Sequence, residues 1–170
     1  MKKNNASIIM SALNEQNVIV NSVNETLRVA RDVFFEFELI LINDGSTDDT
    51  EKLMIKLQKK NKEIQFYNYK KNCGVGHAFK KGLEVSKYEY VMFLNSDSSF
   101  DMESIKKLWS SINDEDCIIG YRSNRNKRKF IRRTQSYLLK SFLNYLFKAS
   151  FEDYTGHLVF KKKNNTKFYN

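Results

Sequence analysis

The sequence contains no proline, and it has only six glycines and two cysteines among 170 residues. Cys73 and Cys117 are too few for a disulfide framework and lack the spacing of a metal site, so we expect two reduced thiols. Without proline, internal repeats or low-complexity stretches, nothing marks an internal domain boundary. The length and the 41% hydrophobic content are sufficient for one domain with its own core.

Long apolar runs are also absent. The run from Ala6 to Met10 is too short for the apolar part of a signal peptide, and Ser7 interrupts it. No stretch approaches the roughly 20 apolar residues of a membrane-spanning helix. We therefore expect a protein on the cytoplasmic side, peripheral at the inner face of the cell membrane.

The net charge of +9 is confined to one segment. Nine of the 29 basic residues lie between Cys117 and Phe151, where no acidic residue occurs, so the other 20 balance the 20 acidic residues. Nucleic-acid binding would need basic residues interleaved with aromatics across the domain, and we do not expect it. Residues 134–151 read as a helix that is apolar on most sides. It either lies in an anionic membrane interface or packs on the core.

Short apolar segments alternate with amphipathic ones along most of the chain. This alternation predicts an α/β fold, a Rossmann-like single domain whose mainly parallel, twisted sheet is flanked by helices. Residues 151–160 are open to interpretation as one more strand or a loop. The predicted strands are 7–11, 37–42, 64–69, 88–94 and 117–121, and the predicted helices are 18–32, 49–60, 77–85 and 102–112.

Polar residues follow the predicted strands. Asn14 and Glu15 follow the first, Asp44 the second, and Asn95 and Asp97 the fourth. Because the carboxyl ends of parallel strands meet at one edge of a sheet, these side chains should converge there. Any one of these loops alone could simply cap the next helix; after the fourth strand Ser98, Ser99 and Asp101 are capable caps.

Two glycines precede the third predicted helix. Gly74 and Gly76 permit a tight turn and a close approach of the backbone to a ligand. They lack the third glycine of G-x-G-x-x-G, and the G-x-x-x-x-G-K pattern is absent, so neither dinucleotide nor P-loop binding is supported.

Four motifs together resemble one family. Over residues 6–121 the chain is similar to the family-2 glycosyltransferases of the GT-A fold. A more specific similarity, to polyprenyl-phosphate (dolichol-phosphate-type) mannosyl or glucosyl transferases, rests on Gly120-x-Arg122, the downstream arginines, Ser136 and Asn144. The four motifs are Ile8 to Glu15, Asn43 to Asp48, Asn72-x-Gly74-x-Gly76-x-Ala78-x-x-x-Gly82 and Asn95-x-Asp97.

The resemblance implies an inverting, metal-dependent transfer of a sugar from a nucleotide diphosphate sugar. Mg²⁺ or Mn²⁺ is the implied cofactor, because a hard cation uses one or two carboxylates together with the phosphates. The implied catalytic residues are Asp97, Arg122 and Asp153; the nucleotide-sugar residues are Asn14, Glu15, Asp44, Gly76 and Asn95; the metal ligands are Asp97 and Asn95; and the acceptor or phosphate residues are Arg128, Arg132 and Arg133.

The acceptor is open between two chemistries. A polyprenyl phosphate is already anionic and needs no general base, whereas a glycan hydroxyl in surface-polysaccharide synthesis would use Asp153 as the base. A non-catalytic nucleotide-sugar-binding relic is a third interpretation. On the resemblance, residues 1–121 are the nucleotide-sugar-binding core, 122–160 are the basic arm and acceptor side of the same domain, and 161–170 are a polar tail.

The sequence departs from the family pattern at four places. Asn95 and Asn43 each replace an acidic residue, which predicts weaker metal binding. The late motif from Asp153 to Leu158 lacks the usual arginine. The chain ends soon after it, which is consistent with a minimal or truncated form.

Overall fold

The computed structural model describes residues 4–97, 101–113, 116–120, 141, 144, 146 and 158–162. The chain divides into two units, residues 1–118 with 159–170 and residues 119–158. The first unit contains nearly all of the described residues. The basic residues from Arg122 to Arg133, Asp153, and all of the helix predicted over 134–151 except residues 141, 144 and 146, which are helical, lie outside the described residues.

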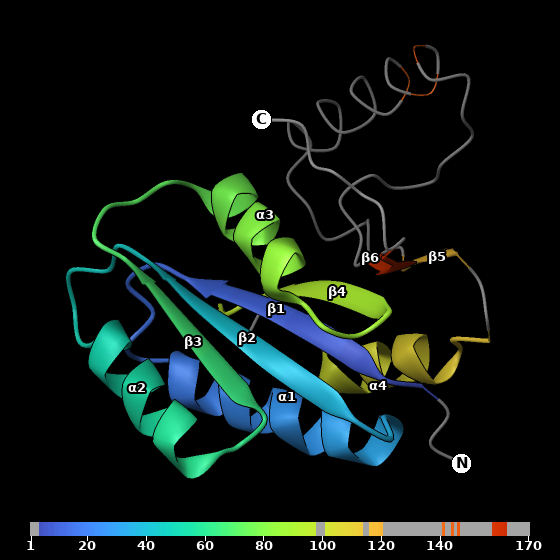
Figure 1. Ribbon diagram of the computed structural model, residues 1–170, viewed down its shortest axis with the longest axis horizontal. Helices are drawn as coiled ribbons and strands as arrows, with labels where there is room; N and C mark the ends of the chain where they lie inside the picture. Colours follow the sequence, from blue (N-terminus) through green and yellow to red (C-terminus); the bar gives the residue numbers. More distant parts are fainter. Residues whose placement is uncertain are drawn as a thin grey trace. The chain divides into compact units, whose positions relative to one another are not determined.

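Strands and helices alternate along the described chain (Figure 1). The sheet has the strand order β3-β2-β1-β4-β6-β5. β1 pairs in parallel with β2 and β4, β2 pairs in parallel with β3, and β6 is antiparallel to β4. The predicted α/β class with a mainly parallel sheet is confirmed. The elements are β1 Ala6–Ala12, α1 Ile19–Val33, β2 Phe37–Asp44, α2 Thr50–Lys60, β3 Ile64–Tyr69, α3 Val75–Val85, β4 Tyr90–Asn95, α4 Met102–Ser110, β5 Cys117–Ile119 and β6 Leu158–Lys161.

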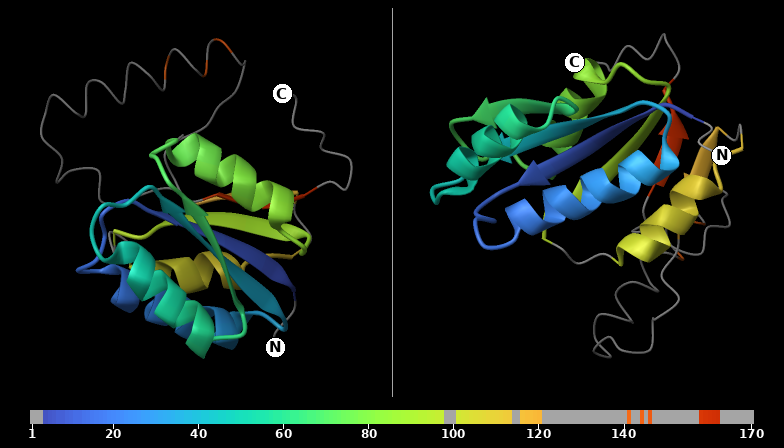
Figure 2. Two further views of the ribbon diagram at one scale, coloured as in Figure 1. Left: turned by 60° about the vertical axis from the view of Figure 1, so that its left-hand side comes forward. Right: turned by 90° about the horizontal axis from the view of Figure 1, so that it is seen from below.

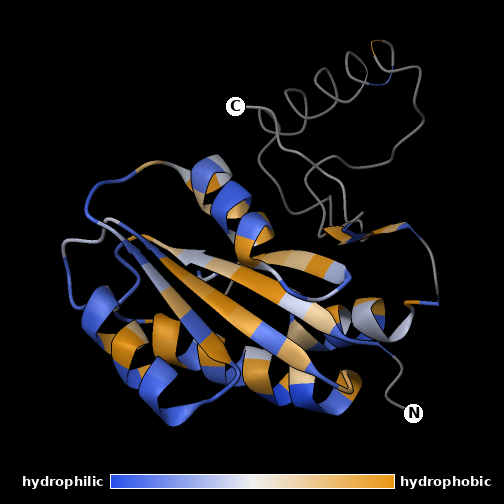
Figure 3. Ribbon diagram, viewed as in Figure 1, coloured by the Kyte–Doolittle hydropathy of each residue, from blue (hydrophilic) through white to orange (hydrophobic). Residues whose placement is uncertain are grey.

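Helices cover both faces of the sheet. α1, α2 and α4 lie on one face and α3 lies on the other (Figure 2). Side chains alternate along β2, so that Leu39 and Leu41 join the core under α1 and α2 while Ile40 and Ile42 join the core under α3. The central strands are therefore hydrophobic along most of their length (Figure 3), as expected for a sheet buried on both faces.

Most elements begin or end one or two residues away from the predicted bounds, and two of these differences have a clear local cause. α3 begins at Val75, two residues early, because Gly74 adopts a φ of +88° and ends the preceding loop there. β4 begins at Tyr90, two residues late, because the Tyr88 backbone N–H donates to the Ser7 hydroxyl at 3.1 Å. Within the part of the chain that the structure describes, no helix has the length and apolarity needed to cross a membrane.

A buried carboxylate ties three strands together at the amino-terminal end of the sheet. Glu38 on β2 is 2% exposed. It accepts hydrogen bonds from the Ser7 hydroxyl on β1 at 2.5 Å, from the Gln65 amide on β3, and from the Lys87 backbone N–H at 2.7 Å. This carboxylate thereby fixes the connection between α3 and β4 against the sheet.

Removal of the Glu38 carboxylate should destabilise the fold. Glu38→Ala leaves one buried and two part-buried donors without their acceptor, so we expect the free energy of unfolding in urea to fall by about 2–4 kcal/mol. The matched control is Glu36→Ala, which removes an exposed carboxylate two residues earlier. Its stability should stay within about 0.5 kcal/mol of the wild type. Equal losses in the two variants would contradict a structural role for the Glu38 network.

Candidate functional site

The carboxyl ends of the parallel strands form one edge of the sheet. In the strand register, Ala12 at the end of β1 lies opposite Asn43 on β2, and Ser11 lies opposite Asn95 at the end of β4. The loops after β1 and β2 and the turn after β4 are therefore neighbours, as the sequence predicts. The same edge includes the loop after β3, because β3 pairs with β2 as far as Asp44 and Tyr69.

Hydrogen bonds join the loop after β1 to the loop after β2. The Asn14 backbone N–H donates to the Ser46 hydroxyl at 2.9 Å, and the Asn14 side-chain oxygen accepts from the Thr47 backbone N–H at 2.8 Å. The Glu15 backbone N–H donates to the Thr50 hydroxyl at 2.8 Å. Asn14 adopts a φ of 57°, a left-handed conformation that asparagine tolerates. These contacts hold Asn14 and Glu15 at the edge.

Aspartate side chains bind backbone N–H groups at the starts of two helices. At the start of α2, Asp48 accepts from the Thr50 backbone N–H at 3.0 Å, so Ser46 and Thr47 are left to bond the neighbouring loop. At the start of α4, Asp101 accepts from the backbone N–H groups of Glu103 and Ser104 at 3.3 and 3.2 Å. The cap expected after β4 is thus Asp101.

Asp44 holds the loop between β3 and α3. Its carboxylate is 4% exposed and accepts from the backbone N–H groups of Cys73 at 2.8 Å and Gly74 at 2.9 Å. The neighbouring Gly45 has a φ of +77°, and a Cβ there would lie 2.5 Å from the backbone nitrogen of Asn72. Only glycine allows this approach, so β2 ends directly against the next loop.

The start of α3 leaves space for a ligand. A Cβ added to Gly74 or Gly76 would meet no heavy atom within 4 Å. The His77 ring packs edge-on against Tyr69, with 5.0 Å between the ring centroids. His77 therefore has a packing contact at the start of α3.

Carboxylates gather at the edge. Partial burial raises the pKa of the Glu15 carboxyl, and the negative charges of Asp97 and Asp48 raise it further. Asp97 and Asn95 are both exposed at the end of β4. Among the described residues, no three His, Cys, Asp or Glu side chains are placed to hold a metal ion. Asp97 and Asn95 stay the predicted metal ligands, and a cation held by so few protein groups would take its remaining ligands from phosphate oxygens.

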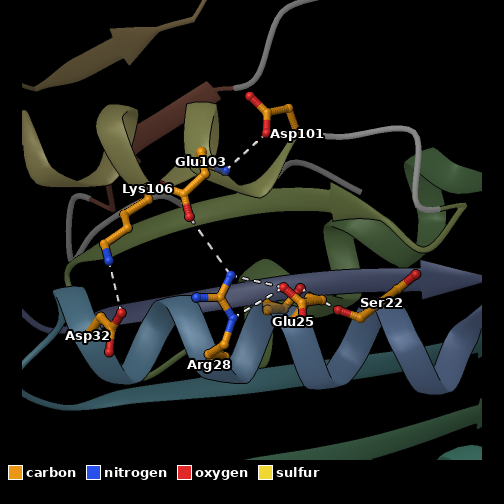
Figure 4. Close-up of polar contacts among 8 residues, drawn as sticks. Ser22, Glu25, Arg28, Asp32, Asp101, Glu103 and Lys106 are labelled. Carbon is orange, nitrogen blue, oxygen red and sulfur yellow. Dashed lines mark hydrogen bonds and ion pairs between the residues drawn. The ribbon is translucent and has the colours of Figure 1, made fainter.

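A cleft of about 330 Å³ lies between α1 and α4, below the turn after β4. Arg28 pairs with Glu103 at 3.9 Å and Asp32 pairs with Lys106 at 2.9 Å across the two helices (Figure 4). The sequence carries no signal for these pairs, because more than 70 residues separate the partners. The cleft is lined by Met10, Asn21, Ser22, Glu25, Thr26, Arg28, Asn95, Asp101, Met102 and Glu103.

Comparisons with known proteins agree with this arrangement. The family model described as Glycosyl transferase family 2 matches residues 7–166. An uncharacterized glycosyltransferase of Rickettsia bellii is 39% identical over 94 residues, which are 55% of this chain and 13% of the relative. A poly-beta-1,6-N-acetyl-D-glucosamine synthase of Staphylococcus epidermidis is 32% identical over 95 residues, which are 56% of this chain and 22% of the relative.

A solved structure shares the fold. The glucosyl-3-phosphoglycerate synthase of Mycobacterium tuberculosis, in complex with Mn²⁺, uridine diphosphate and phosphoglyceric acid, superposes with a TM-score of 0.67 at 19% identity. The match covers 93% of this chain and 56% of that one. The likeness shows that the fold is of the GT-A type. The chain spans less than a quarter of the length of the two curated relatives.

We expect Asp44→Asn to loosen the loop between β3 and α3. The new amide N–H₂ group would face a backbone N–H, so one part-buried donor loses its acceptor and the free energy of unfolding falls by about 1–3 kcal/mol. Amide hydrogen exchange at residues 72–76 should become faster. The control is Asn72→Ala, which removes only the exposed side-chain oxygen that Gly74 N–H shares at 2.9 Å. Equal acceleration in the control would contradict the role of Asp44.

The raised pKa of Glu15 predicts that replacing its carboxyl makes the fold more stable, by an amount that depends on the pH. Ionisation is less favourable in the folded than in the unfolded chain, so Glu15 lowers stability as the pH rises from its ordinary pKa through its raised one. We expect Glu15→Gln to be more stable than the wild type at pH 7 by up to about 0.5 kcal/mol. The difference should vanish below about pH 4, where the carboxyl is protonated in both states.

Urea unfolding at several pH values measures this difference. Glu84→Gln removes the same charge from an exposed position of α3, and it controls for the general effect of a higher net charge. The raised pKa of Glu15 would be contradicted if Glu84→Gln gained the same stability. It would also be contradicted if Glu15→Gln stayed more stable than the wild type at low pH.

Proposed function

Because the chain belongs to glycosyl transferase family 2, we propose that it transfers a sugar from a nucleotide diphosphate sugar, with inversion at the anomeric carbon. The observation that carries this proposal is the convergence of polar loops and the Asn95 to Asp97 turn at one edge of the sheet. In open α/β sheets, ligands bind in the crevice outside the carboxyl ends of the strands. Such a crevice suits an extended, charged donor.

We assign the donor side to five residues. Asn14 and Glu15 face the nucleotide from the loop after β1, Asp44 shapes the loop before α3, and the open space at Gly76 lets the donor approach the backbone. Asn95 lies on the donor side at the end of β4.

We assign the metal to Asp97 and Asn95, whose exposed side chains supply one carboxylate and one amide oxygen. When bound there, Mg²⁺ or Mn²⁺ would neutralise the charge that develops on the leaving diphosphate. With one carboxylate where the family pattern has two, Asp97 carries most of the metal affinity. Arg122 is assigned to the same leaving group, because a guanidinium binds phosphate oxygens in pairs.

We assign the acceptor as a polyprenyl phosphate at the cytoplasmic membrane face. Its phosphate is already anionic, so attack on the sugar requires no general base. Arg128, Arg132 and Arg133 belong to the basic segment of the sequence. They supply charge for the acceptor phosphate and for anionic lipids, at about 1 kcal/mol per basic residue near the surface.

A glycan hydroxyl is the second candidate acceptor. The Staphylococcus epidermidis relative, a poly-beta-1,6-N-acetyl-D-glucosamine synthase, favours it. A hydroxyl must lose a proton as it attacks, and Asp153 would accept that proton. The two acceptors therefore differ in their dependence on one carboxylate.

The test is a panel of nucleotide diphosphate sugars with Mg²⁺ or Mn²⁺, with polyprenyl phosphate, with an oligosaccharide, or with neither. Products are read as lipid-linked sugar, extended glycan and free nucleotide. Lipid-linked sugar supports the first acceptor and extended glycan supports the second. If no donor releases nucleotide under any condition, the proposal of transfer is wrong and the non-catalytic interpretation replaces it.

Substitutions of Asp97, Asn95 and Asp153 should separate metal binding from general-base catalysis. Asp97→Ala should lower both transfer and metal-dependent nucleotide binding by at least about 100-fold, and Asn95→Asp should tighten metal binding. The matched control is Asp101→Asn, which weakens the cap of α4 and should leave metal affinity unchanged. Asp153→Asn should retain substantial activity on a lipid phosphate and lose nearly all activity on a hydroxyl. Full activity of Asp97→Ala would remove the metal assignment.

A further inference from the structure

The turn that carries Asp97 lies beyond the last pair of strand residues. Asn95 is the final residue of β4 in register with β1, so Ser96 and Asp97 continue past the hydrogen-bonded ladder. Ser96 is nevertheless only 3% exposed. A buried backbone carbonyl at such a position needs a donor from elsewhere in the fold.

Ser22 of α1 supplies that donor. Its hydroxyl donates to the Ser96 carbonyl oxygen at 2.7 Å, and Ser22 is 8% exposed. The next buried hydroxyl on the same helix, that of Thr26, donates at 2.8 Å to the Ser22 carbonyl, four residues back within α1. Ser22 thus directs a hydrogen bond out of its helix, 74 residues along the chain, to the turn beside Asp97.

α1 is a firm support for this contact. Ile19, Val23 and Leu27 on the same helix are each at most 2% exposed and belong to the core under the sheet. By contrast, the cleft between α1 and α4 lies next to the turn and is lined by both Ser22 and Asn95. Because the space beside the turn is open, side-chain packing supports it less than it supports the strands. The hydrogen bond from Ser22 bridges the turn to α1.

We propose that Ser22 is a positioning residue for the Asn95 to Asp97 turn; this inference rests on the proposed function of Asp97 at the metal–diphosphate site. The peptide unit between residues 96 and 97 is planar, so fixing the Ser96 carbonyl also fixes the direction in which the chain enters Asp97. Ser22 thereby sets where the Asp97 carboxylate is presented. It touches neither metal nor sugar itself.

Three variants of the full 170-residue chain test this proposal. Ser22→Ala removes the hydroxyl, Ser22→Thr keeps it with an added methyl beside the cleft, and Thr26→Val removes the neighbouring buried hydroxyl without touching the turn. Both deletions should lower Tm by a similar amount, about 2–4 °C. The readouts are amide hydrogen exchange of the 95–97 turn without metal, Mn²⁺ affinity in the presence of UDP or GDP, and, where transfer occurs, kcat and KM for the donor.

Ser22→Ala should accelerate exchange in the turn and weaken Mn²⁺ binding by about 10- to 100-fold, the size of effect seen when a supporting hydrogen bond behind a metal ligand is lost. Ser22→Thr should restore both values and Thr26→Val should change neither. If Ser22→Ala and Thr26→Val changed turn exchange and Mn²⁺ affinity equally, the proposal would be overturned. A wild type that binds no Mn²⁺ and transfers no sugar would overturn the proposed function, while turn exchange would still decide the role of Ser22.

Discussion

The parallel pairing of β1 with β2 on one side and β4 on the other is the constraint on which the rest of the structure depends. It places the carboxyl ends of three strands at one edge, with Ala12 opposite Asn43 and Ser11 opposite Asn95. Both faces of these strands are buried, so a slip of one residue would exchange the side chains that meet α3 with those that meet α1. The core therefore fixes the register, and the register fixes which polar residues become neighbours at the edge.

The polar residues at that edge divide into two groups. One group holds the loops: the Asn14 and Asp44 side chains accept hydrogen bonds from the backbone of other loops, and the Ser22 hydroxyl binds the turn after β4. The other group, with Asn95 and Asp97 at its centre, is exposed. A rigid edge of this kind can present exposed groups at fixed positions, because the supporting hydrogen bonds lie behind them.

The sequence predicted the elements and their order, because the spacing of apolar residues and the polarity of the chain change where each strand ends. Strands and helices also alternate clearly along the sequence. It also placed Asn95 and Asp97 at a strand end. It did not predict how the loops are joined. Ser46 and Thr47 lie just before α2, where such residues commonly cap a helix, yet they bond to Asn14, more than 30 residues earlier. Such contacts depend on three-dimensional proximity, which the local propensities of the residues do not predict. Glu38 was missed for the same reason, since a carboxylate in a strand gives no sign of the donors around it.

The electrostatics of the edge favour a cationic partner. Partial burial and the negative charges of Asp97 and Asp48 oppose ionisation of Glu15 and raise its pKa. The folded chain therefore holds negative groups together at some loss of stability. Hydrogen bonds and packing elsewhere, such as those of Glu38, offset this loss. Groups that destabilise a fold and are held in place by its scaffold are typical of binding and catalytic sites. A divalent cation at Asp97 would relieve the repulsion, and a diphosphate would then complete the balance of charge. The raised pKa of Glu15 is therefore in keeping with the cation and diphosphate that we propose at this edge.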